Sequence, residues 1–111
     1  MEKSPVIRMG VTNKNDKNIT PKMNEAMVEF LSSAIDNGCT GSTFAEDDER
    51  VIVYTMWSDE MTLERFRSSE IYKTKEQKII QSFVSANFEL SRDILFNSTA
   101  KILFMNCIIM I

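Results

Sequence analysis

Apolar positions along the first third of the chain predict a short strand followed by an amphipathic helix. Residues 6–11 are an apolar-rich run typical of a strand. Thr20 followed by Pro21 is a typical helix start, and Asn37-Gly38 is a typical helix end. Between them, seven apolar side chains recur every three or four residues and so share one stripe of a helix: Met23, Ala26, Met27, Phe30, Leu31, Ala34 and Ile35.

The next segment predicts a β-hairpin. Two extended runs, 39–45 and 51–57, flank the short polar stretch 46–50. This stretch holds four consecutive carboxylates, which could suggest a metal site. We interpret it as the solvated tip of the hairpin, because neighbouring side chains on a turn splay apart and rarely converge on one ion.

Two pairs of capping residues predict two helices after the hairpin. The pair 58–59 begins one helix and the pair 68–69 begins the next, because serine and aspartate hydroxyl or carboxyl oxygens cap free backbone N–H groups. Residues 82–98 mix apolar and polar side chains without a clear period, and we expect them to be a connection over the surface. The strongly apolar run 101–111 predicts the last strand.

The resulting order, β-α-β-β-α-β, predicts one domain over residues 1–111 with an α+β, ferredoxin-like fold. Its antiparallel sheet would carry helices on one face. Both faces of the strands at 51–57 and 102–110 are apolar, and the helices can cover only one face. We therefore expect a homodimer in which a second copy covers the other face.

Charge and composition exclude several classes of function. Thirteen Lys and Arg against sixteen Asp and Glu, with no basic cluster, argue against a nucleic-acid partner. No apolar run is long enough to span a bilayer and the first residues do not resemble a signal peptide, so we expect a cytoplasmic protein without a membrane partner. The chain has no histidine, which excludes His-ligated zinc, a proximal haem histidine and Ser-His-Asp catalysis. Its two cysteines lack the spacing of a metal site.

Three segments resemble the antibiotic biosynthesis monooxygenase superfamily. They are Gly38-Cys39-Thr40-Gly41, Tyr54-Thr55-Met56-Trp57-Ser58-Asp59-Glu60 and Phe66-Arg67-Ser68-Ser69-Glu70-Ile71-Tyr72-Lys73. The resemblance covers about residues 5–75 and implies a dimeric α+β barrel.

Within that superfamily the chain is most similar to the haem-degrading monooxygenases. Those enzymes use an Asn on the first strand, a Trp on the middle helix and an iron-ligating His on the following helix. The resemblance places these three positions near Arg8, on Phe66 and on Glu76. All three residues are replaced, so we do not expect haem degradation by that mechanism.

Other members oxidise phenols or quinols with dioxygen and without a cofactor. The resemblance therefore implies a cofactor-independent monooxygenase that acts on a small aromatic or polycyclic substrate and uses no metal. Two alternatives stay open: a non-catalytic ligand-binding or regulatory dimer with the same fold, and a haem binder with Tyr or Met as the ligand. No residue pattern in the chain identifies a catalytic group.

We expect a pocket between the sheet and the helices, lined by Phe66 and Tyr72. These two rings flank the break between the second and third helices, where the helices can splay apart above the sheet. Glu76 lies one turn after Tyr72 on the same side of the helix. Arg8 and Phe30 complete the candidate pocket, with Arg67 and Tyr54 as further polar candidates.

Overall fold

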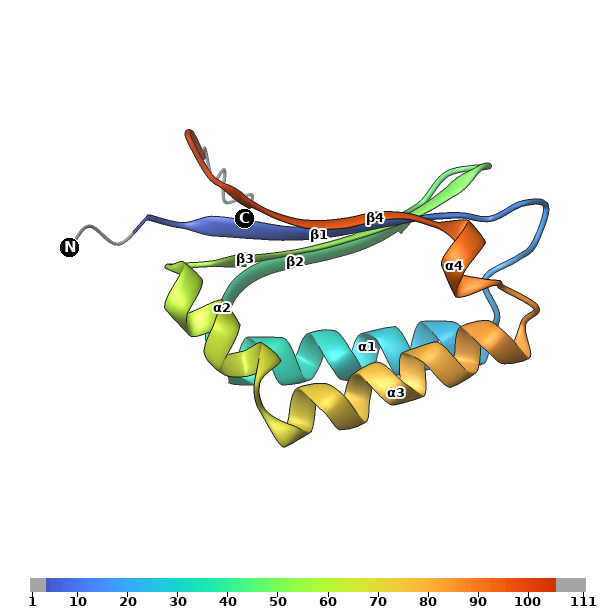
Figure 1. The fold of residues 1–111 in the computed structure, drawn as a ribbon, viewed down its shortest axis with the longest axis horizontal. Coiled ribbons are helices and arrows are strands. Elements are labelled where there is room, and N and C mark those ends of the chain that lie inside the picture. The colour runs from blue at the N-terminus through green and yellow to red at the C-terminus, as the bar shows by residue number, and fades with distance from the viewer. Residues whose placement is uncertain (1–3, 106–111) are drawn as a thin grey trace, which may run out of the picture.

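A four-stranded antiparallel sheet forms one layer of the molecule and the helices form the other (Figure 1). The computed structural model describes residues 4–105. In chain order its elements are β1 (Val6–Asn13), α1 (Pro21–Asp36), β2 (Cys39–Glu46), β3 (Arg50–Trp57), α2 (Glu60–Arg67), α3 (Glu70–Ser85), α4 (Leu90–Asp93) and β4 (Ile94–Lys101). The strand order is β2-β3-β1-β4. This arrangement confirms the predicted α+β, ferredoxin-like fold with helices on one face of the sheet.

The predicted capping residues fix where the helices begin. The Thr20 hydroxyl accepts a hydrogen bond from the Met23 backbone N–H at 3.1 Å, and Pro21 is the first residue of α1. In each later pair the second residue is the cap, so Asp59 begins α2 and Ser69 begins α3. The chain therefore breaks at 68–69 as predicted, and α2 and α3 are separate helices.

The prediction of the last strand was wrong. The strand β4 occupies Ile94–Lys101, inside and just after the segment expected to be a surface connection, whereas residues 102–105 lie outside it. The rest of the predicted strand, 106–111, lies outside the described residues. The polar residues in the middle of β4 conceal it in the sequence. It forms because β1 pairs with it along almost its whole length, from Val6 opposite Lys101 to Thr12 opposite Ile94.

The two faces of the sheet differ in composition. Residues directly opposite one another in antiparallel strands share a face. On the face away from the helices, three rows cross β3, β1 and β4: Ile52–Val11–Phe96, Tyr54–Met9–Ser98 and Met56–Ile7–Ala100. The face toward the helices is mixed: Val6, Val51, Val53 and Trp57 are apolar, whereas Arg8, Gly10, Thr12, Thr55, Asn97 and Thr99 are polar or small. The more uniformly apolar face is therefore the one that the helices leave uncovered.

Buried side chains form two separate clusters, of which the first joins the helices to the sheet and the second joins α1, α3 and the segment around α4. One cluster, which we call the aromatic cluster, consists of Val6, Ala34, Cys39, Trp57, Leu63 and Phe66, with Phe30 and Tyr72 packed against it. The other, the α3–α4 cluster, consists of Met23, Phe83 and Phe88, with Ile19, Ile79, Ala86 and Leu90 packed against it. The core is therefore divided, and the space between the clusters is where a cavity lies.

The buried carboxylate of Asp93 fixes α4 beside the loop that precedes α1. Asp93 is fully buried and accepts hydrogen bonds from the Glu89 backbone N–H at 2.8 Å, from Lys17 Nζ at 3.2 Å, and from the side chains of Asn15 and Arg92. The backbone N–H of Glu89 and the side chains around it hold the pKa of Asp93 well below its usual range, against the opposing effect of burial. These bonds determine where β4 begins.

We predict that Asp93 makes the protein sensitive to acid. Its pKa is lower in the folded protein, so its stabilising effect is complete above the unfolded pKa of about 3.9 and is lost as pH falls through and below that value. The free energy of unfolding, measured by urea titration from pH 7 to pH 3, should fall below about pH 4. Asp93→Asn should lower it at pH 7 and flatten this dependence.

The exposed Asp48, at the hairpin tip, provides the matched control. Asp48→Asn should leave both the stability at pH 7 and the acid dependence as they are. Equal stability of Asp93→Asn and the unmodified protein at pH 7 would contradict the assigned role of Asp93.

Candidate functional site

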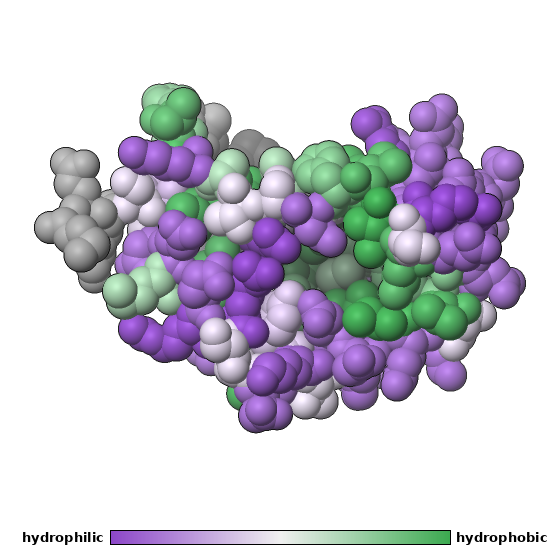
Figure 2. Space-filling model, in the orientation of Figure 1, coloured by the Kyte–Doolittle hydropathy of each residue, from purple (hydrophilic) through white to green (hydrophobic). Residues whose placement is uncertain are grey.

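A cavity of about 310 Å³ lies between the sheet and the helices. Strands β1, β3 and β4 form its floor and all four helices contribute to its walls. Figure 2 shows this side of the molecule hollowed between the two layers, with hydrophobic residues around much of the hollow and hydrophilic residues along the rest of its rim. Its volume is at the lower end of the range for small-molecule sites and about twice that of a cavity known to hold benzene. A ligand of two or three fused rings is therefore a suitable size.

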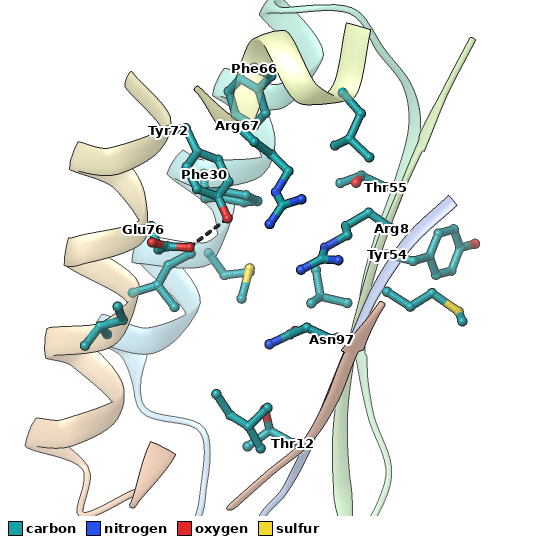
Figure 3. Close-up of a pocket in the computed structure, with 18 of the residues that line it drawn as sticks. Arg8, Thr12, Phe30, Tyr54, Thr55, Phe66, Arg67, Tyr72, Glu76 and Asn97 are labelled. Carbon is teal, nitrogen blue, oxygen red and sulfur yellow. Dashed lines mark hydrogen bonds between the residues drawn. The ribbon is translucent and has the colours of Figure 1, made fainter. Parts of the chain in front are cut away.

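Aromatic rings form one end of the cavity. Phe66 stacks on Trp57, with ring centroids 5.4 Å apart, and meets Tyr72 edge-on at the same distance. The ring centroid of Phe30 lies 5.8 Å from that of Phe66 and 5.7 Å from that of Tyr72. The break between α2 and α3 places Phe66 and Tyr72 on consecutive helices, and their perpendicular rings fill the angle between them (Figure 3). Such edge-to-face packing holds each ring in one orientation.

Tyr72 and Glu76 form a hydrogen-bonded pair on the helix side of the cavity. Both residues lie on α3, one turn apart, and the Tyr72 hydroxyl donates to Glu76 Oε2 at 2.7 Å (Figure 3). Burial raises the pKa of Tyr72, and the hydrogen bond to Glu76 and the negative charge of that carboxylate raise it further. The phenol is therefore protonated at neutral pH, and its hydrogen bond holds the Glu76 carboxylate in place.

Two arginines face one another across the cavity. Arg8 enters from β1 and Arg67 from the end of α2, and their guanidinium groups point toward each other (Figure 3). Burial lowers the pKa of Arg8, and the positive charge of Arg67 lowers it further. Burial also acts against the charge of Arg67, but the Tyr72 oxygen and Glu64 outweigh it, so the pKa of Arg67 is raised. Both groups nevertheless carry a full charge at neutral pH.

The floor of the cavity has polar groups that come from three strands. Thr12, Thr55 and Asn97 all line it. The Thr55 hydroxyl accepts a hydrogen bond from the Trp57 indole N–H at 2.8 Å, which fixes the indole against the floor. Gly10 leaves room for Asn97, because a Cβ at this position would lie only 2.5 Å from Asn97 Oδ1.

All five residues of the predicted pocket line this one cavity: Arg8, Phe30, Phe66, Tyr72 and Glu76. That the cavity binds a ligand stays a prediction. Arg67 and Tyr54 also line it, although the ring of Tyr54 points to the opposite side of the sheet (Figure 3).

Sequence reasoning missed Thr12, Thr55 and Asn97. A signal for two of these residues was present in the sequence. Arg8 and Thr12 lie on the same face of a strand as the buried Val6, and Thr55 lies between Val53 and Trp57 on the face toward the helices. Polar residues at alternate positions on a face that packs under helices indicate a lined pocket rather than a dry core. Asn97 gave no such signal, because its strand was not recognised.

The described part of the chain contains no group of three or more His, Cys, Asp or Glu side chains placed to hold a metal ion. The polar groups that line the cavity are suited instead to an organic molecule: two guanidinium groups, a phenol, a carboxylate, an amide and two hydroxyls. None of the helices within residues 4–105 is long and apolar enough to cross a membrane.

No protein-family model matches the sequence, and no curated protein matches it. The fold, in contrast, is similar to solved structures over nearly the whole chain. One is SnoaB from Streptomyces nogalater, a cofactor-independent oxygenase, at 6% identity and a TM-score of 0.64 over 96% of this chain and 97% of that one.

Two further structures are each named a "putative antibiotic biosynthesis monooxygenase". The protein from Chloroflexus aurantiacus is 11% identical, with a TM-score of 0.58 over 94% of this chain and 98% of that one. The protein from Caulobacter crescentus is 6% identical, with a TM-score of 0.63 over 94% and 92%. The resemblance to the antibiotic biosynthesis monooxygenase superfamily is confirmed as a shared fold.

Proposed function

We propose that the protein is a cofactor-independent monooxygenase that acts on a small aromatic or polycyclic phenol. The observation that carries this proposal is the cavity itself, in which an aromatic wall faces a carboxylate held by a phenol. The three positions that correspond to the catalytic residues of the haem-degrading relatives, Arg8, Phe66 and Glu76, all lie on this cavity. The name of SnoaB, a cofactor-independent oxygenase with this fold, supports the same reaction class.

The chemistry requires a substrate that supplies its own electrons. A fused-ring phenol has a keto form in which one ring carbon is a CH₂ group, and loss of a proton from that group gives an electron-rich anion. We propose that the Glu76 carboxylate removes this proton, and that the hydrogen bond from Tyr72 holds the carboxylate in place. The anion passes an electron to dioxygen, and the resulting radicals combine into a C–O bond. Cleavage of the O–O bond then leaves one oxygen as the ring carbonyl and the other as water, so CH₂ and O₂ become C=O and H₂O.

The apolar surroundings serve this reaction in two ways. They bury the ring system of the substrate, and they exclude water from the reactive anion. Phe30, Phe66 and Trp57 provide rigid rings on which a flat substrate can pack. The dioxygen molecule, which is small and apolar, needs no binding group of its own.

We further propose that the protein is a homodimer in the cytoplasm, joined through the uncovered face of the sheet. The three rows of that face place seven large apolar or aromatic side chains side by side, with no charged residue among them: Ile7, Met9, Val11, Ile52, Tyr54, Met56 and Phe96. A contiguous apolar surface of this kind is rare on soluble monomers, and a second copy of the same face would cover it.

The main alternative is a dimer that binds a ligand without converting it. It would use the same cavity, so binding alone does not separate the two proposals. Turnover of dioxygen does.

We predict that purified protein incubated with anthrone, a fused-ring substrate with an acidic CH₂ group, consumes dioxygen and forms anthraquinone. With ¹⁸O₂, the product should gain one labelled oxygen in mass spectrometry. Glu76→Gln should reduce the rate by about a hundredfold or more, because it removes the base. Glu70→Gln changes an exposed carboxylate at the start of the same helix and should leave the rate unchanged.

A rate no greater than that without protein, together with tight binding of the ring compound, would favour the non-catalytic alternative. Turnover that survives Glu76→Gln would contradict the role of Glu76.

We predict that light scattering at micromolar concentration gives a mass about twice the 12.8 kDa of one chain. Met9 lies at the centre of the uncovered face, so Met9→Asp should give a folded or partly folded monomer. Val28 is half exposed on α1, and Val28→Asp should leave the mass unchanged. A monomer mass for the unmodified protein would contradict the dimer.

A further inference from the structure

Positive charge is concentrated in the cavity of a chain that is negative as a whole. The net charge of the protein is −3. Three charged side chains line the cavity, however, and two of them, Arg8 and Arg67, are positive, while only Glu76 is negative. Low-polarity walls strengthen the field of such charges, so the cavity attracts anions.

The two arginines differ in how many hydrogen-bond and ion-pair partners the protein provides for their guanidinium groups. Arg67 pairs with Glu64 at 3.1 Å, and its Nε atom is buried without a hydrogen-bond partner among the described residues. Arg8 donates a hydrogen bond to the Thr99 hydroxyl at 3.2 Å, and no carboxylate within residues 4–105 forms an ion pair with it. A guanidinium group has five N–H donors, so Arg8 has most of its donors still to offer.

The surroundings of Arg8 make its charge costly. It is partly buried, it faces a second positive charge, and the one carboxylate that lines the cavity is bonded to Tyr72. The charges of Glu64 and Glu76 favour the Arg8 cation but do not outweigh burial and Arg67, and an anionic group from a ligand between the two arginines would lower the remaining cost. The residue opposite Arg8 on β3 is Thr55, which adds no charge of its own.

We propose that the cavity binds the ionised oxygen of an aromatic ligand between Arg8 and Arg67, with the ring system packed against Phe30, Phe66 and Trp57. This inference rests on the proposed function, which assigns the same cavity to a fused-ring substrate, and it specifies that substrate as an anionic one. The shared chemistry is an oxygen anion on a flat ring, and both an aromatic carboxylate and a phenolate present it.

The consequence for the reaction is direct. A phenol bound with its oxygen between two guanidinium groups loses its proton more readily, because both positive charges favour the phenolate. The ligand would then enter the electron-rich state that reaction with dioxygen requires.

Binding of two naphthalenes of the same shape tests the inference. 2-Naphthoate carries a charge and 2-naphthylmethanol does not, and calorimetry at low salt gives both dissociation constants. We expect 2-naphthoate to bind at least about tenfold more tightly. Arg8→Gln should bring the two affinities within about twofold of each other, and Arg8→Lys should restore part of the difference. Arg65→Gln removes the same charge from an exposed position on α2 and should leave the difference intact.

A nitronaphthol, which changes colour when it ionises, tests the phenolate arm. Its pKa should fall by about one unit or more on binding to the unmodified protein and not on binding to Arg8→Gln. A charge preference with an unchanged pKa of the bound dye would assign the site to carboxylates, and a lowered pKa would assign it to phenolates. Arg67→Gln provides a second variant if Arg8→Gln does not fold.

Equal binding of both naphthalenes to the unmodified protein, or a preference that survives both Arg8→Gln and Arg67→Gln, would overturn the inference and leave the proposed function standing. Binding of neither compound would overturn both.

Discussion

The separation between the helix layer and the sheet is the constraint on which the rest of this structure depends. The aromatic cluster around Trp57 and Phe66 and the α3–α4 cluster around Met23, Phe83 and Phe88 pack independently of one another. The aromatic cluster joins the helices to the sheet, and the α3–α4 cluster joins α1, α3 and the segment around α4. The space between them is left open instead of being filled by a continuous core. The break between α2 and α3 and the buried Asp93 carboxylate keep these clusters in place.

The polar residues on the inner face of the sheet follow from the same arrangement. A sheet that encloses a cavity can carry Arg8, Thr55 and Asn97 on its inner face, because a ligand or water can satisfy them there. The other face of the sheet is apolar in its central rows, as Met9 and Tyr54 show. One choice of register therefore provides both the polar floor of the cavity and an apolar surface suited to a second copy.

The sequence predicted the elements whose signals are local and missed those that depend on distant partners. Thr20-Pro21 and the Ser68-Ser69 break identified the helices, and the seven-residue stripe of α1 identified its buried face. Helical spacing also placed Tyr72 and Glu76 together, and the break between the helices placed Phe66 beside them. The strand β4 has no such signal, since its hydrogen bonds come from β1, which is more than eighty residues earlier in the chain. Asn97 was missed with it, because the face on which a residue lies depends on the register of its strand.

In this account the cavity is open space and not part of a filled core. The most direct test is to fill it with a larger side chain. Val53 lies on the floor opposite Gly10, and Val53→Phe adds a ring that points into the space. The measurement is the free energy of unfolding by urea at one protein concentration. If the void is real, the free energy of unfolding of Val53→Phe should stay within about 1 kcal/mol of that of the unmodified protein, or rise, and 2-naphthoate binding should be lost. A loss of about 1–3 kcal/mol, as for overpacking a filled core, would contradict this account.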